Sequence, residues 1–165
     1  KLFTMKRLIY SAFVLLTLTF VLSSCDEDKY LEWKYLNETW LEQYKEQHKN
    51  DPDFFQTESG LCYKVIHQGA TRRPNASSII YVRYKGELIT GKVFDETDET
   101  VRFQLSNLVP GWIEGVTKMN VGGRYMFYIP YELAYGEDGS GSIPPYSTLI
   151  FDITLDGSDD QLPND

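Results

Sequence analysis

The side chains that usually carry covalent or metal chemistry are scattered in this sequence. Its two histidines, His48 and His67, stand apart and lack the spacing of metal ligands. No grouping of serine, histidine and aspartate suited to hydrolysis is recognisable. Cys62 lies in LCYKVI, a short run of strand-forming residues, where a small thiol is usually packed in the core. We therefore expect no metal site and no cofactor.

Trp112 is the residue whose surroundings most need an explanation. It lies in LVPGWIEG, between Gly111 and Gly115 and two positions after Pro110. Because proline fixes its own φ and glycine lowers helix stability, a tryptophan here is not expected inside a long helix. We expect Pro110 and Gly111 to turn the chain out of a strand, so that Trp112 enters the first turn of a short helix. Pointing between helix and sheet, it can close the floor of a cavity.

Beyond Glu58, the segments that would position Trp112 carry an apolar residue at every second position. Apolar residues alternate with polar ones in four segments, which predicts strands of an antiparallel sheet with one buried face. These apolar residues are Ile80, Val82 and Tyr84; Val101, Phe103 and Leu105; Tyr125, Phe127 and Ile129; and Leu149, Phe151, Ile153 and Leu155. One run at helical spacing, from Trp112 to Met119, is ended by Gly122-Gly123. The pattern predicts an α+β domain in which one short helix covers the sheet.

The start of the chain resembles a bacterial secretion signal. Met5-Lys6-Arg7 precedes residues 8–22, an uncharged run that falls short of the ~20 residues that span a bilayer. The junction Leu22-Ser23-Ser24-Cys25 resembles the lipobox of lipoproteins, in which the cysteine is lipidated and becomes the mature N-terminus. The alternative is an uncleaved anchor with an incidental cysteine. Both place the rest of the chain outside the cytoplasm, and lipidation of Cys25 would leave Cys62 without a disulfide partner.

Charge bears on both location and partners. The acidic residues 26–28 resemble the signals that send some lipoproteins to the outer face of the outer membrane, although they would also suit a solvated tether. We expect a lipid anchor in the outer membrane, on its periplasmic or its outer side. The net charge of −8 argues against a nucleic-acid partner, because phosphates would repel such a surface.

A second helix is predicted over residues 30–49. Its apolar residues recur at intervals of three and four with charges between them, and they are Trp33, Leu36, Trp40, Leu41 and Tyr44. Asn50-Asp51-Pro52-Asp53 ends this helix. The apolar stripe must pack either on the main domain or on a second copy in a homodimer. Docking on the domain is favoured because the helix is short.

Residues 59–155 resemble the FKBP family of peptidyl-prolyl cis/trans isomerases. Six segments are similar to segments of that family and follow one another in the same order. They are SGLCYKVI, VRYKGEL, GKVFDET, FQLSNLVPGWIEGVTKM, VGGRYMFYIPYELAYG and IPPYSTLIFDITL. The resemblance implies a twisted antiparallel sheet of five or six strands wrapped around one short helix. It divides the chain into a signal peptide (1–24), an acidic tether and amphipathic helix (25–56), an isomerase domain (57–157) and a flexible tail (158–165).

The resemblance also implies a binding pocket, residue by residue. Asp95, Tyr135 and the backbone N–H of Val109 are implied to act on the substrate. The residues implied to bind the proline are Tyr84, Phe94, Val101, Leu108, Trp112, Ile143 and Phe151. Val101 stands where eukaryotic members often have phenylalanine, and residues 137–142 lack the aromatic or histidine usual in that loop. Residues 95–99 are expected to form a solvated loop.

The activity implied by the resemblance is isomerisation of X-Pro bonds in envelope or surface proteins. The barrier of ~18–20 kcal/mol arises from amide resonance, which the twisted transition state loses. A dry aromatic cavity can bind the twisted, less polar amide better than the planar one, without a nucleophile or cofactor. The alternative is a binding module that captures a partner with little turnover. A macrolide inhibitor is left open as a ligand.

Overall fold

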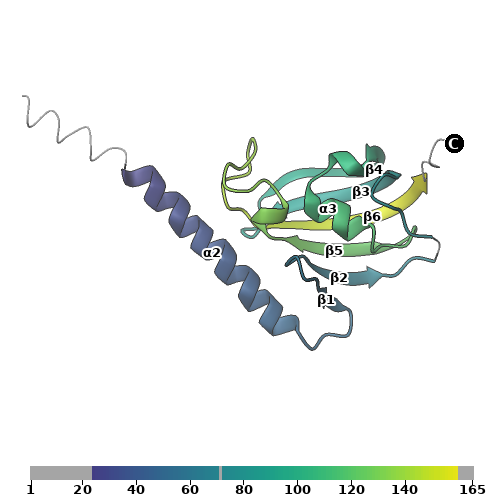
Figure 1. The fold of residues 1–165 in the computed structure, drawn as a ribbon, viewed down its shortest axis with the longest axis horizontal. Helices are drawn as coiled ribbons and strands as arrows, with labels where there is room; N and C mark the ends of the chain where they lie inside the picture. The colour runs from purple at the N-terminus through teal and green to yellow at the C-terminus, as the bar shows by residue number, and fades with distance from the viewer. Residues whose placement is uncertain (1–23, 71, 160–165) are drawn as a thin grey trace, which may run out of the picture.

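The computed structural model describes residues 24–70 and 72–159, and within them six strands form one antiparallel sheet (Figure 1). The strand order is β1-β2-β5-β6-β3-β4. The strands are β1 (Phe54–Gln56), β2 (Cys62–His67), β3 (Ile79–Leu88), β4 (Val93–Gln104), β5 (Arg124–Ile129) and β6 (Leu149–Asp159). The helices are α2 (Ser24–His48) and α3 (Pro110–Val116), with 3-10 turns at η1 (Leu105–Asn107) and η2 (Tyr131–Leu133). The predicted α+β fold is confirmed.

The first and last strands along the chain, β1 and β6, lie close to the predicted limits of the main domain, residues 57 and 157. β1 pairs with β2 just before residue 57, and β6 continues through Ser158 and Asp159, which pair with β3. The predicted tail (158–165) therefore begins within β6. Residues 160–165, together with residues 1–23, which make up nearly all of the predicted signal peptide, lie outside the described residues. No helix in the described part of the chain is both long and apolar enough to cross a membrane.

The short helix α3 packs closely on one face of the sheet, and the glycines around Trp112 explain how. A Cβ atom on Gly111 would lie 2.3 Å from Cγ2 of Ile129, and one on Gly115 would lie 2.6 Å from Cε1 of Phe127. Both partners belong to β5 and are buried. Glycine at these positions therefore lets the helix backbone rest on the strand, while Trp112 between them reaches the core.

The predicted alternation is confirmed along β3, β5 and β6, whose inward residues form the core under α3. Two local predictions are wrong. The predicted helical run reaches Met119, whereas α3 ends at Val116 and continues as a turn in which the Met119 N–H donates to the carbonyl of Val116. Residues 95–99 do not form a loop but belong to β4, where Asp95 pairs with Gly86 of β3. Because β4 is an edge strand, its outward side chains can be charged while its backbone stays paired on one side.

The predicted amphipathic helix is confirmed as part of α2, and it packs on the face of the sheet opposite α3. Leu41 is buried there with Cys62 and Tyr128, which alternate with the core-facing residues of β2 and β5. Figure 1 shows α2 as a long helix whose C-terminal end lies beside β1. Docking on the domain, the favoured prediction, is thus what the structure shows. Burial raises the pKa of the Cys62 thiol to about 11, which keeps it protonated and unreactive near neutral pH.

One residue of the predicted apolar stripe does not take part in this packing. The Leu36 side chain is 48% exposed, whereas its neighbour Asn37 is fully buried. The packed face runs through Trp33, Asn37, Leu41 and Tyr44, at intervals of four, four and three. The apolar pattern alone placed the stripe one position away at this turn, because a buried asparagine reads as a surface residue.

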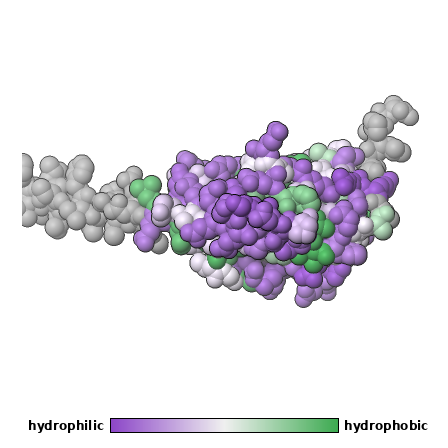
Figure 2. Space-filling view, turned by 90° about the horizontal axis from the view of Figure 1, so that it is seen from below, coloured by the Kyte–Doolittle hydropathy of each residue, from purple (hydrophilic) through white to green (hydrophobic). Residues whose placement is uncertain are grey.

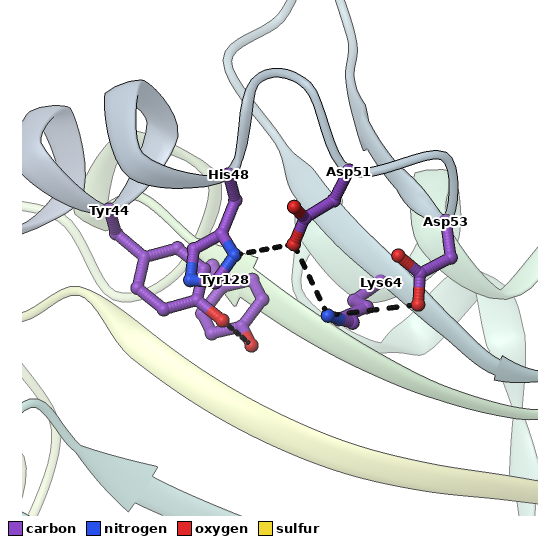
Figure 3. A network of polar contacts seen from close by, with 6 residues as sticks. All are labelled: Tyr44, His48, Asp51, Asp53, Lys64 and Tyr128. Atoms are coloured by element: carbon purple, nitrogen blue, oxygen red, sulfur yellow. Dashed lines mark hydrogen bonds and ion pairs between the residues drawn. The ribbon is translucent and has the colours of Figure 1, made fainter.

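Polar contacts attach the C-terminal end of α2 to the sheet (Figure 3). The hydroxyl of Tyr44 hydrogen-bonds that of Tyr128. His48 Nδ1 lies 2.7 Å from Oδ2 of Asp51, and this contact holds the pKa of the Asp51 carboxyl below its usual value. Lys64 of β2 lies 3.4 Å from the same oxygen.

The face of the molecule in Figure 2 is mostly hydrophilic, with hydrophobic residues in small separate areas.

Candidate functional site

A cavity of about 460 Å³ opens between α3, the strands β3, β4 and β6, and the segment that precedes β6. Its lining brings together nine of the ten residues that the family resemblance implies for a pocket: Tyr84, Phe94, Asp95, Leu108, Val109, Trp112, Tyr135, Ile143 and Phe151. Four further residues line it, namely Phe103, Asn107, Ser140 and Ser142. The predicted pocket residues thus converge from distant parts of the chain.

The floor and walls of this cavity are aromatic rings in edge-to-face contact. The ring of Trp112 lies 5.2 Å from that of Phe151 at 84°, and 5.4 Å from that of Tyr84 at 88°. Phe94 meets Phe151 at 5.4 Å and 85°. Aromatic rings prefer this geometry over face-to-face stacking, and each pair contributes about 0.5–1.5 kcal/mol beyond its buried area. The cavity is therefore preformed and apolar at its base.

Gly86 of β3 makes room for two of these rings. A Cβ atom at this position would lie 2.6 Å from Cε2 of Phe94 and 2.7 Å from Cε1 of Phe151. Gly86 pairs with Asp95 on one side and with Phe151 on the other. A glycine inside a strand signals the close approach of another group, and here the group is a pair of aromatic rings.

A hydrogen bond fixes the polar edge of the cavity. The hydroxyl of Tyr84 donates to Oδ2 of Asp95 across 2.6 Å. Burial, together with this bond to a carboxylate, raises the pKa of Tyr84, so the phenol stays protonated and remains a donor. The Asp95 side chain is held in one orientation beside the cavity, with its remaining lone pairs still able to accept.

Two further polar groups at the cavity, the Val109 N–H and the Tyr135 hydroxyl, have no hydrogen-bond partner among the residues that the structure describes. Val109 precedes α3, and its carbonyl accepts the N–H groups of Trp112 and Ile113. In the described part of the chain, no hydrogen bond from the Val109 N–H itself is found. Tyr135 is 40% exposed at the cavity. Both groups are therefore available as hydrogen-bond donors at the cavity.

The segment before β6, residues 134–148, forms one wall of the cavity, and we call it the flap. Ser140 and Ile143 exchange backbone hydrogen bonds of 2.9 Å each, which close a tight turn. Ile143 is buried, and Ser140 and Ser142 line the cavity beside it. Serines therefore occupy the part of the wall where the sequence lacks an aromatic residue.

Val101 is the predicted pocket residue that does not line the cavity. It packs against the core under α3, and Phe103 reaches the cavity instead. The Phe103 ring lies 6.0 Å from that of Tyr84 and 6.3 Å from that of Trp112. Phe103 follows Val101 by two residues and lies on the same face of β4. The alternation thus identifies the face that both residues share, but not which of the two lies near the cavity.

Comparison with known proteins gives concordant matches. The family model described as FKBP-type peptidyl-prolyl cis-trans isomerase matches residues 70–156. The FKBP-type 22 kDa peptidyl-prolyl cis-trans isomerase of Escherichia coli (strain K12) is 44% identical over 116 residues, 68% of this chain and 56% of that protein. FkpA of the same strain is 39% identical over 122 residues, 72% of this chain and 45% of FkpA. This chain thus spans about half the length of these curated relatives.

Solved structures agree with the sequence matches. The crystal structure of FkpA from Escherichia coli superposes with a TM-score of 0.77 and 34% identity, over 88% of this chain and 70% of that chain. A peptidyl-prolyl cis-trans isomerase structure from Pseudomonas syringae pv. tomato superposes with a TM-score of 0.66 and 28% identity, over 73% and 91% of the two chains.

Proposed function

The chain belongs to the FKBP-type peptidyl-prolyl cis-trans isomerase family, and on that premise we propose that it catalyses the isomerisation of X-Pro bonds in polypeptides of the cell envelope. The observation that carries this proposal is the aromatic cavity above Trp112, with Asp95 held beside it. Such a cavity suits the apolar ring of proline. A macrolide inhibitor that fills the same cavity is a further proposed ligand, and it would compete with the peptide.

The geometry suggests how catalysis proceeds without a covalent intermediate. Trp112, Tyr84 and Phe151 hold the proline ring, while the Val109 N–H and the Tyr135 hydroxyl hold peptide carbonyls. The amide then twists about its C–N bond and loses resonance, so it becomes less polar and fits a dry aromatic site better than the planar form. The site therefore binds the transition state more tightly than the ground state, and each tenfold gain in rate needs about 1.4 kcal/mol of this difference.

Asp95 is expected to act mainly on the twisted amide. Asp95→Val should lower kcat for short Ala-Pro and Leu-Pro peptides about tenfold, and weaken binding of an unreactive proline mimic by only about twofold. The apolar contacts to the ring remain, whereas the oriented carboxylate is lost. Asp98→Val is the matched control, because Asp98 is exposed on the same strand and is not among the lining residues. Equal losses of kcat and of affinity in Asp95→Val would assign this carboxylate to ground-state binding.

The second candidate function is a binding module that captures a partner with little turnover. The observation that favours it is the middle of the flap, residues 137–142, which contributes Ser140 and Ser142 to the cavity and contains no aromatic residue. A protease-coupled isomerisation assay separates the two functions. A rate above the uncatalysed one that an excess of proline mimic abolishes supports the enzyme; saturable binding of the mimic without such a rate supports the module.

A lipid anchor at Cys25 in the outer membrane is proposed from the sequence, since the Cys25 side chain lies outside the described residues. Cys25→Ser should release the protein from the membrane fraction and abolish labelling by a fatty-acid probe. Cys62→Ser is the matched control, because Cys62 is buried in the domain and should leave both properties unchanged. Labelling and sedimentation that persist in Cys25→Ser would exclude the anchor.

A homodimer through α2 is also proposed. Tyr30, Leu31, Tyr35 and Leu36 are exposed apolar or aromatic residues on the N-terminal half of α2, and a second copy would cover them. Replacing Leu31 and Tyr35 together by glutamate should convert a dimer to a monomer in sedimentation equilibrium, since burying two unpaired carboxylates is costly. The control is Gln43→Glu, an exposed position outside this surface. An unchanged mass in the double variant contradicts the proposed interface.

A further inference from the structure

Asn37 joins α2 to the C-terminal end of the flap. Its side chain is fully buried, and both ends of its amide are bonded. Oδ1 accepts the backbone N–H of Thr148 at 2.8 Å, and Nδ2 donates to the carbonyl of Trp33 at 2.8 Å. A buried amide is tolerated when its hydrogen bonds are made, and their geometry then fixes its partners. Asn37 therefore fixes the chain one residue before β6 begins.

Trp33 continues this attachment toward the cavity. Its indole N–H donates to Oγ of Ser147 at 3.0 Å, and the Ser147 hydroxyl donates to the carbonyl of Pro144 at 2.8 Å. Pro144 directly follows Ile143, which lines the cavity. Two hydrogen bonds thus connect the helix to the residue next to the cavity wall.

Lys34 contacts aromatic residues at both ends of the flap. Its Nζ lies 4.7 Å from the ring centre of Tyr146 and 5.5 Å from that of Tyr131. The two rings meet edge to face at 5.3 Å, and Tyr131 belongs to η2, just before the flap begins. Tyr146 has φ 59, a left-handed conformation that a tyrosine keeps only where its surroundings hold it. Helix α2 therefore contacts the chain at both ends of the flap, at η2 before the flap begins and at Tyr146 shortly before β6.

At its start the flap is bonded to η2, where the carbonyl of Tyr131 accepts the N–H groups of Ala134 and Gly136. Further along, its backbone hydrogen bonds fold it on itself. The Tyr146 N–H donates to the carbonyl of Gly136 at 2.9 Å, and the Gly139 N–H donates to that of Tyr135 at 3.2 Å. Such bonds set the shape of the loop but not its position over the cavity. Tyr135, Ser140, Ser142 and Ile143 all line the cavity from this one segment, so its position decides whether that wall is complete.

We propose that α2 is a positioning element of the active site, in which Asn37 and Trp33 hold the flap in its peptide-binding position. This proposal rests on the isomerase function proposed above. A flap that is in place for only a fraction of the time lowers the apparent affinity for the peptide by that fraction. Asn37 and Trp33 thus act on KM through the flap and do not touch the substrate.

The test is Asn37→Ala in the full chain, measured with a short Ala-Pro peptide and by hydrogen exchange. KM should rise about five- to tenfold while kcat stays within about twofold, because the released flap reduces the binding-competent fraction. Amides of Ile143, Tyr146 and Thr148 should exchange at least about tenfold faster, while the Phe127 amide in β5 keeps its protection.

Leu41→Ala is the matched control. Leu41 lies on the same helix and packs on Cys62 and Tyr128 rather than on the flap. Tyr128 is part of the network in Figure 3. It should destabilise α2 packing while KM and flap exchange remain as in the wild type. A KM that rises as much in Leu41→Ala, or flap amides that exchange at the wild-type rate in Asn37→Ala, overturns the proposal.

Trp33→Phe serves where Asn37→Ala fails to fold. It removes the hydrogen bond to Ser147 and keeps an aromatic ring in place, so it should shift KM and flap exchange in the same direction by a smaller factor. Wild-type values of both in this variant also contradict the proposal. Should the wild-type chain show no turnover, the proposed function fails, and flap exchange together with affinity for an unreactive proline mimic still decides whether α2 positions the flap.

Discussion

Trp112→Leu is expected to lower kcat/KM for short Ala-Pro and Leu-Pro peptides about 30-fold, equivalent to ~2 kcal/mol of transition-state stabilisation. Leucine keeps the floor apolar but cannot meet Tyr84 and Phe151 edge to face, as the indole does at 5.4 and 5.2 Å. The proline ring of the substrate then loses the indole, which is its largest contact surface in the cavity. Because the Trp112 side chain also reaches from α3 into the buried core, the variant should lose about 2–3 kcal/mol of unfolding free energy to the cavity it leaves.

Trp40→Leu is the control for this prediction. It makes the same chemical change in α2, where Trp40 stacks on Tyr44 at 5.1 Å, away from the cavity lining. We expect kcat/KM to stay within about twofold of the wild type, with only stability reduced. Isomerisation rates, affinity for the proline mimic and circular dichroism should be compared in both variants. A folded Trp112→Leu protein with the wild-type rate would show that this cavity is not the active site.

Gly86→Ala is expected to have the second largest effect, a fall of about 20-fold in kcat/KM caused by a single added methyl group. The new Cβ would overlap the rings of Phe94 and Phe151 at 2.6 and 2.7 Å, so both must move. The two rings meet across 5.4 Å, and displacing them shifts the cavity wall into the space for proline. Overpacking of this kind also costs about 1–3 kcal/mol of stability.

Gly157→Ala provides the comparison, because it adds the same methyl group to β6 in the same sheet. Its Cβ would lie 3.3 Å from Cδ2 of Tyr81, a contact that a small ring movement relieves, and neither residue lines the cavity. Activity should stay within about twofold of the wild type. Thermal unfolding and isomerisation measured together separate the two cases. A Gly86→Ala variant as active as Gly157→Ala would mean that the Phe94 and Phe151 walls do not shape the site.

Much of the site could be predicted from the residues together with the family resemblance, and the exceptions have physical reasons. Strand alternation showed that Val101 and Phe103 share the inner face of β4. It could not show that Phe103, next to the end of β4 and the turn η1, reaches the ring of Trp112 and the cavity, whereas Val101 does not line the cavity. The charge of residues 95–99 predicts a loop because charge indicates exposure, but an edge strand is also exposed while its backbone is paired.

The sequence by itself determined the local elements: where strands alternate, where Pro110 and the glycines place a short helix, and which aromatic residues the inner face carries. These features depend on neighbours within a few residues, so their pattern can be read along the chain. The tertiary structure alone decided what α2 does. Asn37 meets Thr148 across 111 positions and Trp33 meets Ser147 across 114. An asparagine becomes a buried attachment only when folding brings an unpaired backbone N–H to it, and no periodicity encodes that partner.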